Sequence, residues 1–217
     1  MTDQKHGFSS GASHHSEPAQ RIIGITGGVG MGKTTVSNYL AAKYQIPVLD
    51  ADLYARDAVE PGSHVLEKIV ERYGSSILIA DHLDRQRLGE IIFNNRAERL
   101  WLEQQIHPYV RDRIQTTLLS PPAANSPIVA LVIPLLFEAR MTDLVNEIWV
   151  VCSAAEQQQQ RLQERDQLNL EQANARINSQ MAIEKKIQQA DVVLDNSENL
   201  ESLYQQIDRA LQPETMP

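Results

Sequence analysis

The feature that most constrains this chain is a glycine-rich segment near its beginning, RIIGITGGVGMGKTT, from Arg21 to Thr35. Residues Gly27 to Thr34 match the spacing G-x-x-x-x-G-K-[ST], between an apolar run and a helix-like run. Glycines allow successive backbone N–H groups to point into one concavity at a helix N-terminus, where the helix dipole favours an anion. The segment therefore predicts a nucleotide-phosphate site, against the alternative of a glycine-rich turn that binds nothing.

Two side chains in this segment are suited to phosphate chemistry. Lys33 would bring a mobile positive charge to the outer phosphates, and the hydroxyl of Thr34 is suited to ligate Mg²⁺. Both follow the last glycine of the motif directly, so both would stand at the start of the helix.

Composition limits the other classes of function. With 217 residues, 42% of them hydrophobic, the chain is long enough to fold as one domain around a buried core. Its net charge of −8 argues against bulk affinity for nucleic acid or an anionic membrane. Cys152 is the sole cysteine, which excludes a disulfide framework, and no apolar run reaches the ~20 residues of a membrane span. We expect a cytoplasmic protein with a disordered polar tail over residues 1–20.

A second short strand is expected over residues 46–52, where IPVLDAD ends in Asp50 and Asp52. In an open α/β sheet, ligands collect outside the carboxyl ends of the strands. If the chain turns after Asp50, Asp52 would cap the next helix; the alternative is a carboxylate that accepts a proton from an attacking hydroxyl.

The middle of the chain, residues 61–119, is helical in pattern. Apolar residues recur at helical spacing in three stretches: Val65, Ile69 and Tyr73; Leu88, Ile91 and Ile92; Leu102, Ile106, Val110, Ile114 and Leu118. Pro108 is expected to kink or restart the last helix. An insertion of this size is more than a crossover needs. It favours a site for a second substrate, with a purely structural cover as the alternative.

Three later apolar runs complete the predicted sheet, at residues 128–133, 148–152 and 192–195, and residues 200–211 form an amphipathic helix. Strands that alternate with helices imply a parallel sheet with right-handed crossovers. The expected fold is α/β: a three-layer α/β/α P-loop NTPase with a five-stranded parallel sheet. Its core would comprise residues 21–60, 120–152 and 190–212.

Residues 153–189 are helical by propensity but poor in apolar residues, which is typical of a lid. Arg161 and Arg165 are four residues apart and share a helix face, and Arg176 follows on the next helix. On closure, their guanidinium groups would meet the charge that develops on a transferred phosphoryl group. The alternative is a solvated surface on which the arginines pair with Glu164 or Asp166.

Several stretches together resemble the dephospho-coenzyme A kinase family, over residues 21–211. They are GITGGVGMGKTT, LDADLYARDAVEPGS, IIFNNRAERLWLEQQIHPYVR, VIPLLFEA, RLQERD and ADVVLDNS. The resemblance implies a P-loop kinase core with a helical CoA-binding insertion over residues 61–119 and a helical lid over residues 153–189. The implied activity transfers the γ-phosphoryl group of ATP to the ribose 3′-hydroxyl of dephospho-CoA, with Mg²⁺.

The resemblance also assigns the reacting groups. Asp52 would be the base that orients the 3′-hydroxyl, and Asp50 would act on Mg²⁺ through water. Lys33, Arg161 and Arg165 would neutralise charge on the phosphoryl oxygens. The residues around ATP would be Gly28, Val29, Gly30, Met31, Gly32, Lys33, Thr34, Thr35 and Asn196.

Other positions match the family less directly. Arg56 and His107 fall at motif positions near the acceptor. Met31 stands where serine is common, which should matter little because the loop binds through backbone N–H groups. Ile133 stands where an aspartate is common before Pro134, so no metal ligand is expected there.

Two other classes stay open at this point. A nucleoside or nucleotide kinase would bind a smaller acceptor, and a nucleotide-binding switch would transfer no phosphoryl group to a small molecule. The long helical middle argues against the first, and the arginine-bearing lid against the second. For the preferred class we expect a small-molecule partner, no nucleic acid or membrane, and a monomer or weak homo-oligomer.

Overall fold

The computed structural model describes residues 20–212, and the predicted parallel sheet is confirmed. Its five strands are β1 (Arg21–Gly27), β2 (Val48–Asp50), β5 (Ile128–Val132), β6 (Glu147–Cys152) and β7 (Val192–Asp195). They lie in the order β2-β5-β1-β6-β7, and every neighbouring pair is parallel. Of residues 1–20, which are expected to be disordered, residues 1–19 lie outside the described residues, so the expectation stays a prediction for them. Gln20 is described, and its Nε2 donates to the carbonyl oxygens of Ala123 and Ser126 at 2.8 Å.

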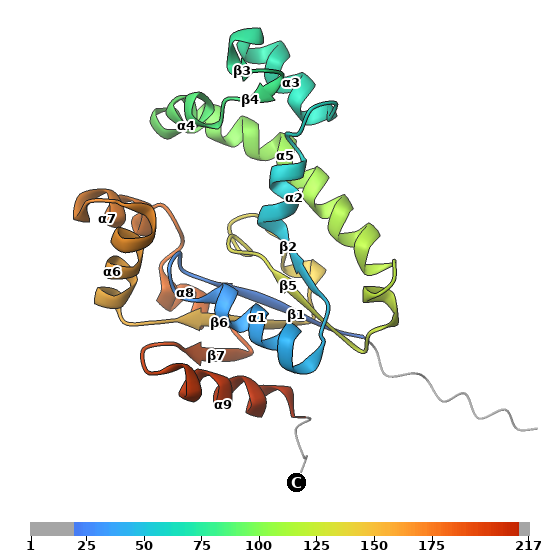
Figure 1. Ribbon diagram of the computed structural model, residues 1–217, viewed down its shortest axis with the longest axis vertical. Helices are drawn as coiled ribbons and strands as arrows, with labels where there is room; N and C mark the ends of the chain where they lie inside the picture. The colour runs from blue at the N-terminus through green and yellow to red at the C-terminus, as the bar shows by residue number, and fades with distance from the viewer. Residues whose placement is uncertain (1–19, 213–217) are drawn as a thin grey trace, which may run out of the picture.

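Helices cover both faces of this sheet, which makes three layers (Figure 1). α1 (Lys33–Tyr44) and α9 (Leu200–Leu211) pack on one face, against side chains such as Ile23 and Ile25. α5 (Arg96–Leu118) packs through Val110 and Ile114 on the other. Alternate residues of each strand point to opposite faces, so a continuous apolar run fills both cores. Each fully buried large apolar side chain contributes about 1.5–3 kcal/mol.

The second strand is shorter than the span of residues 46–52 that was predicted for it. β2 stops at Asp50, and α2 (Ala51–Asp57) begins at the next residue. The Asp50 carboxylate accepts a hydrogen bond from the backbone N–H of Asp52 at 2.8 Å, so Asp50 caps α2. The alternative in which Asp52 caps the next helix was therefore wrong, because α2 begins two residues earlier than that role requires. The side chain of Asp52 has no capping role and lines a cavity that is described below.

The helical middle has a small core of its own. It contains α3 (His64–Tyr73) and α4 (Arg85–Asn94), and its buried residues include Val65, Ile69 and Leu88. α5 is shared: Leu102 lies in this core, and the C-terminal half of the helix packs on the sheet. α5 runs through Pro108 as one helix, so it does not restart there.

One element in this region was not predicted. After a 3-10 turn (Ser75–Ile77), a two-stranded hairpin forms from β3 (Leu78–Ile79) and β4 (His82–Leu83). Its turn residues Ala80 and Asp81 both have positive φ, a conformation that Asn-Gly signals far more clearly.

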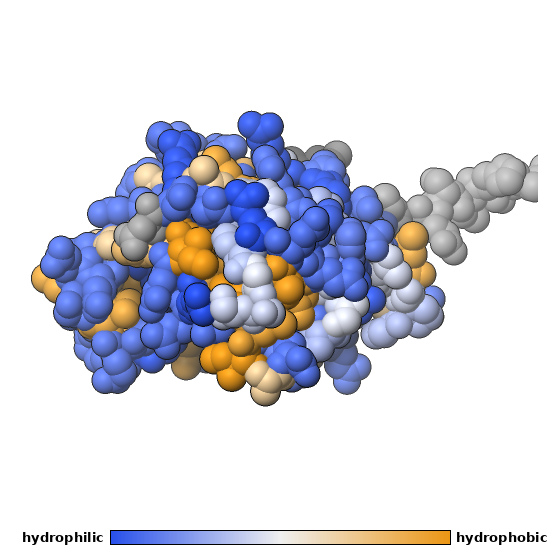
Figure 2. Space-filling model, turned by 90° about the horizontal axis from the view of Figure 1, so that it is seen from above, coloured by the Kyte–Doolittle hydropathy of each residue, from blue (hydrophilic) through white to orange (hydrophobic). Residues whose placement is uncertain are grey.

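The predicted lid contains α6 (Ala155–Asp166) and α7 (Leu170–Asn178), which pack on each other, and the short α8 (Ile183–Ile187), which contacts β6. In Figure 1, α6 and α7 stand at one side of the molecule, and the helical middle stands above the sheet. Seen from above, the surface is largely hydrophilic, with apolar residues gathered near its centre (Figure 2). Within residues 20–212, no helix is long and apolar enough to cross a membrane.

Candidate active site

A cavity of about 1100 Å³ lies at the carboxyl edge of the sheet, between the glycine-rich loop, the start of α2 and the helices α6 and α7. Its lining residues are Val29, Gly30, Gly32, Lys33, Thr34, Asp50, Asp52, Leu53, Arg56, Val132, Pro134, Leu135, Arg161, Glu164, Arg165, Asp166, Arg176 and Gln180. Lys33 and Asp52 thus face one common space, as a single transferred group between them requires.

The glycine-rich loop needs glycine for two distinct reasons. Gly27 and Gly32 have φ of 143° and 103°, values that side-chain-bearing residues rarely adopt. A Cβ at Gly27 would lie 2.2 Å from the carbonyl oxygen of Val151, and one at Gly32 would lie 2.2 Å from Nδ2 of Asn196. The loop is therefore pressed against β6 and the end of β7, and its other side opens to the cavity beside the N-terminus of α1.

Lys33 is held within this loop. Its Nζ donates hydrogen bonds to the carbonyl oxygens of Gly27 (3.1 Å) and Gly28 (2.9 Å). Burial, and after it the charge of Lys186, lowers the pKa of Lys33 to about 8, against a smaller opposite effect of Asp52. A lysine desolvated in this way gains most from an incoming anion.

Asp52 stands in the first turn of α2, opposite Lys33. Burial, followed by repulsion from Asp50, raises the pKa of the Asp52 carboxyl above its usual range, although Lys33 and Arg56 oppose the shift. The residue is exposed to solvent on the cavity side, where its side chain lines the cavity. A carboxylate with a raised pKa is a better proton acceptor than an ordinary aspartate.

The arginines of α6 and α7 differ in their partners. Arg161 donates from Nη2 to the carbonyl oxygen of Asn196 at 3.2 Å, and its buried Nη1 has no hydrogen-bond partner among the described residues. Arg165 instead makes two 2.8 Å bonds to Asp166, and Arg176 binds the same carboxylate at 2.7 Å. The predicted alternative, pairing with Asp166, therefore describes Arg165 and Arg176 in this structure.

Some predicted residues lie behind the cavity and do not line it. Met31 and Asn196 are buried, and Nδ2 of Asn196 donates to the carbonyl oxygen of Met31 at 2.9 Å, so Asn196 supports the loop from behind. Ile133 is buried in the apolar core beside β5, as its side chain requires. His107 lies on α5 outside the lining residues, and burial lowers its pKa.

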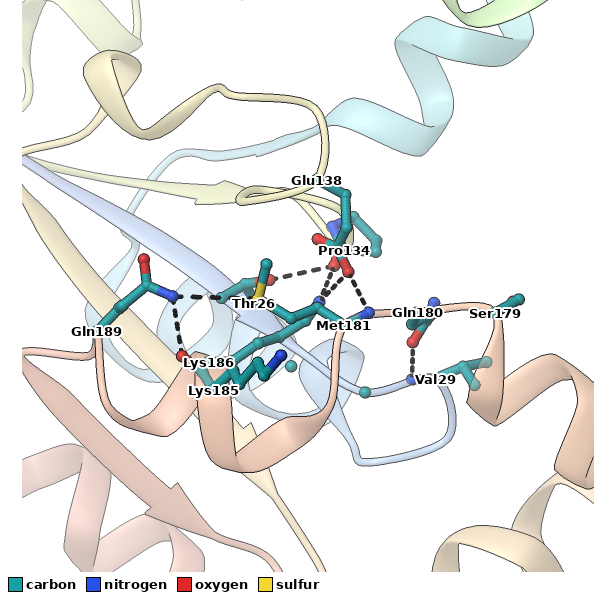
Figure 3. A network of polar contacts seen from close by, with 12 residues as sticks. Thr26, Val29, Pro134, Glu138, Ser179, Gln180, Met181, Lys185, Lys186 and Gln189 are labelled. Carbon is teal, nitrogen blue, oxygen red and sulfur yellow. Dashed lines mark hydrogen bonds and ion pairs between the residues drawn. The ribbon is translucent and has the colours of Figure 1, made fainter. Parts of the chain in front are cut away.

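Sequence reasoning missed a group of lid residues that hold the loop. Oε1 of Gln180 accepts from the backbone N–H of Val29 at 2.9 Å, and Nε2 of Gln158 donates to the carbonyl oxygen of Val29 at 2.8 Å. Lys186 is fully buried in α8, where its ammonium meets Glu138 and Pro134 (Figure 3). Gln158 stands in a run of four glutamines, Lys186 follows another lysine, and Gln180 stands alone. No pattern in the sequence separates these three residues from their neighbours.

A second, smaller hollow of about 370 Å³ adjoins the first. Asp52 and Arg56 line both, and the remaining lining is mainly apolar: Ala55, Val59, Leu83, Arg85, Leu88, Gly89, Ile92, Leu102 and Ile106. Asp52 therefore stands where the phosphate-loop cavity meets an apolar hollow built from the helical middle.

The donor set for Mg²⁺ is small. Thr34 and Asp50 both line the cavity, and residues 20–212 contain no cluster of three or more metal-binding side chains. Mg²⁺ characteristically keeps several waters and takes few protein ligands besides substrate phosphates. A hydroxyl and a carboxylate at the phosphate loop fit that chemistry.

A phosphate loop at the end of β1, carboxylates at the end of β2 and in the first turn of α2, and arginines from α6 and α7 at the same cavity are the features of a P-loop kinase. The family model for dephospho-CoA kinase matches residues 21–202. The chain belongs to this family, transferases that use ATP in the last step of coenzyme A synthesis.

Known dephospho-CoA kinases are similar to this chain in sequence and in structure over most of its length. A dephospho-CoA kinase of Trichormus variabilis is 58% identical over 193 residues, which cover 88% of this chain and 97% of the relative. A crystal structure from Thermus thermophilus superposes with a TM-score of 0.76 at 32% identity, covering 88% of this chain and 96% of that one. Dephospho-CoA kinase from Campylobacter jejuni gives a TM-score of 0.66 at 28% identity, covering 88% and 95%.

Proposed function

We propose that this chain transfers the γ-phosphoryl group of ATP to the ribose 3′-hydroxyl of dephospho-CoA in the cavity between Lys33 and Asp52. The observation that carries the proposal is that both side chains line one cavity at the carboxyl edge of the sheet.

The hydroxyl oxygen of the acceptor attacks the γ-phosphorus, the new O–P bond forms, and the bond to the bridging oxygen of ADP breaks. Asp52 orients the hydroxyl and accepts its proton late, because a loose transition state needs little activation of the nucleophile. ADP leaves with the electron pair of the broken bond. The raised pKa of Asp52 suits it to hold that proton.

Positive charge on the phosphoryl oxygens would come from three side chains. Lys33 exchanges its two loop carbonyls for phosphate oxygens, and Arg161 supplies its buried Nη1. Arg165 must first leave Asp166, so we assign it to the closed lid. Thr34, together with Asp50 through water, would hold Mg²⁺, which neutralises the phosphate oxygens when bound.

The backbone of residues 28–35 would surround the phosphates of ATP, with Asn196 supporting the loop from behind. For the acceptor, we assign the apolar hollow next to Asp52, with Arg56 at its mouth. Residues 61–119 would then serve as the acceptor-binding insertion and residues 153–189 as the lid. His107 stands one residue from Ile106 of that hollow and would support its wall rather than contact the reacting groups. We further propose a cytoplasmic enzyme that acts as a monomer or weak homo-oligomer without nucleic-acid or membrane partners.

A coupled assay with ATP, Mg²⁺ and one of three acceptors, dephospho-CoA, adenosine or uridine, tests the proposal. We expect turnover with dephospho-CoA alone. Asp52→Asn should lower kcat by about 10²-fold or more while leaving the fold intact, because the proton acceptor is lost but the shape is kept. Robust turnover by this variant would remove Asp52 from its role, and equal turnover of adenosine would remove the assigned acceptor.

A further inference from the structure

Lys186 is an unusual residue in this fold. Its side chain is completely buried in α8, on the sheet side of the lid, and it lines neither cavity. The ammonium is within 2.9 Å of Oε1 of Glu138, and it donates a 3.0 Å hydrogen bond to the carbonyl oxygen of Pro134. Neither Lys186 nor Glu138 is assigned a contact with the reacting groups in the proposed phosphoryl transfer, although the charges of both act on Lys33.

A buried ammonium is costly even when it is paired, and apolar replacements of such pairs are often as stable or more stable. Stability alone therefore does not explain why an ion pair of Lys186 and Glu138 is present at this position. The notable property of this ion pair is that its hydrogen bonds connect several segments that are distant in the sequence.

Four segments meet at the pair (Figure 3). The carbonyl oxygen of Pro134, after β5, also accepts a hydrogen bond from Oγ1 of Thr26 in β1 at 3.2 Å. Oε1 of Glu138 also accepts from the backbone N–H of Met181 at 2.9 Å. Met181 lies between α7 and α8, where the lid returns to the sheet. The pair thus connects the root of the lid to the carboxyl edge of two central strands.

The residue next to this connection reaches the phosphate loop. Gln180 directly precedes Met181, and its Oε1 accepts from the N–H of Val29 at 2.9 Å. Gln158 of α6 binds the carbonyl oxygen of Val29, so the lid holds that residue from both sides. The position of Gln180 follows from that of Met181, because the two share a peptide unit.

We propose that Lys186 and Glu138 are positioning residues: their ion pair fastens the root of the lid to the sheet, and this holds Gln180 against Val29 of the phosphate loop. The inference rests on the proposed nucleotide site, and it adds the device that keeps the loop preorganised before the nucleotide arrives. Preorganised donors bind their anion without first rearranging, so the pair lowers the KM for ATP.

The test uses the full chain and separates stability from positioning. Glu138→Met leaves an unpaired buried ammonium and should lower Tm strongly, whereas the double variant Lys186→Met/Glu138→Met should recover Tm. We expect the KM for ATP to stay raised by about tenfold in the double variant, with kcat changed less, because the N–H of Met181 loses its acceptor on Glu138 and the carbonyl oxygen of Pro134 loses its donor on Lys186. Lys185→Met, at the exposed neighbouring position, is the matched control and should behave as the wild type.

Hydrogen exchange without nucleotide provides a readout independent of catalysis. The amides of Met181 and Val29 should exchange faster in the double variant than in the wild type or in Lys185→Met, and Gln180→Ala should speed exchange at Val29 and raise the KM for ATP without lowering Tm. A double variant with wild-type KM and wild-type exchange at both amides overturns the proposal. So does a wild-type KM in Gln180→Ala. Loss of acceptor specificity in the wild type would instead contradict the proposed function and leave the exchange result unaffected.

Discussion

Lys33 illustrates how function at a single residue opposes stability. Its ammonium is enclosed by the phosphate loop, close to Lys186 and Arg165, with Asp52 and Glu138 as the opposing charges. Burial and Lys186 lower its pKa to about 8, so the free enzyme holds a cation that would be more stable in water. The desolvation of the Lys33 ammonium is an unfavourable free energy in the free protein, and a bound phosphate would offset it.

Lys33→Met should therefore abolish turnover and at the same time stabilise the nucleotide-free protein. The folded-state pKa lies below the usual 10.5, so the wild type gains stability as the pH rises from about 8 to 10.5, and bears the full penalty below that window. A pKa difference of one between the folded and unfolded states corresponds to about 1.4 kcal/mol of stability, and the two lost loop hydrogen bonds offset part of the gain. We therefore expect a net gain of roughly 1–2 kcal/mol at pH 7. Urea unfolding at pH 7 and pH 10 measures it; a variant less stable than the wild type at pH 7 would contradict the desolvation argument.

At the level of elements, the junction of β2 and α2 contains one residue, Asp50, with both a structural and a proposed chemical role. Asp50 ends β2, caps α2 through the N–H of Asp52, and lines the cavity as the proposed outer ligand of Mg²⁺. The cap also sets the direction in which Asp52 leaves the backbone. Structure and chemistry are thus coupled through one carboxylate.

Two substitutions separate these duties. Asp50→Asn keeps a good N-cap, so stability should stay within about 0.5 kcal/mol, while the Mg²⁺ concentration needed for half-maximal activity should rise. Asp50→Ala should lose the cap as well and cost about 1 kcal/mol. Thermal unfolding without nucleotide and Mg²⁺ titration of activity measure the two effects. If Asp50→Asn requires no more Mg²⁺ than the wild type, Asp50 has no role toward the metal.

The hairpin of β3 and β4 and the helix α5 mark where local patterns were insufficient. Ala80-Asp81 adopts positive φ without glycine or asparagine, so the turn has no clear sequence signature. α5 continues through Pro108 because its apolar residues pack on both ends, and packing outweighs the lost backbone hydrogen bond there.

Across the whole molecule, α5 connects two cores. Leu102 is buried in the core of the helical middle, and Ile114 is buried against the sheet. One rigid helix with an end in each core should make the two unfold together.

Leu102→Ala and Ile114→Ala should each lower stability by about 2–5 kcal/mol, the usual effect of deleting a buried aliphatic side chain. Both should shift one shared unfolding transition, as followed by far-UV circular dichroism and by tryptophan fluorescence from Trp101 and Trp149. Because Trp101 lies in the helical middle and Trp149 in the sheet, separate transitions at the two probes in single-tryptophan variants would show that α5 does not couple the cores.

The sequence alone determined the phosphate loop, the strands of the sheet, the family and the expectation that Lys33 and Asp52 meet. These depend on short-range spacing and on apolar runs that have few alternatives. The tertiary structure decided which carboxylate caps α2, and that Arg165 is paired with Asp166 while Nη1 of Arg161 meets no acceptor within residues 20–212. It also decided that Lys186 of α8 is buried against Glu138. Those facts depend on which side chains meet across distant segments. Identical residue types, such as Lys185 and Lys186, are distinguished only by the neighbours that the folded chain brings to them.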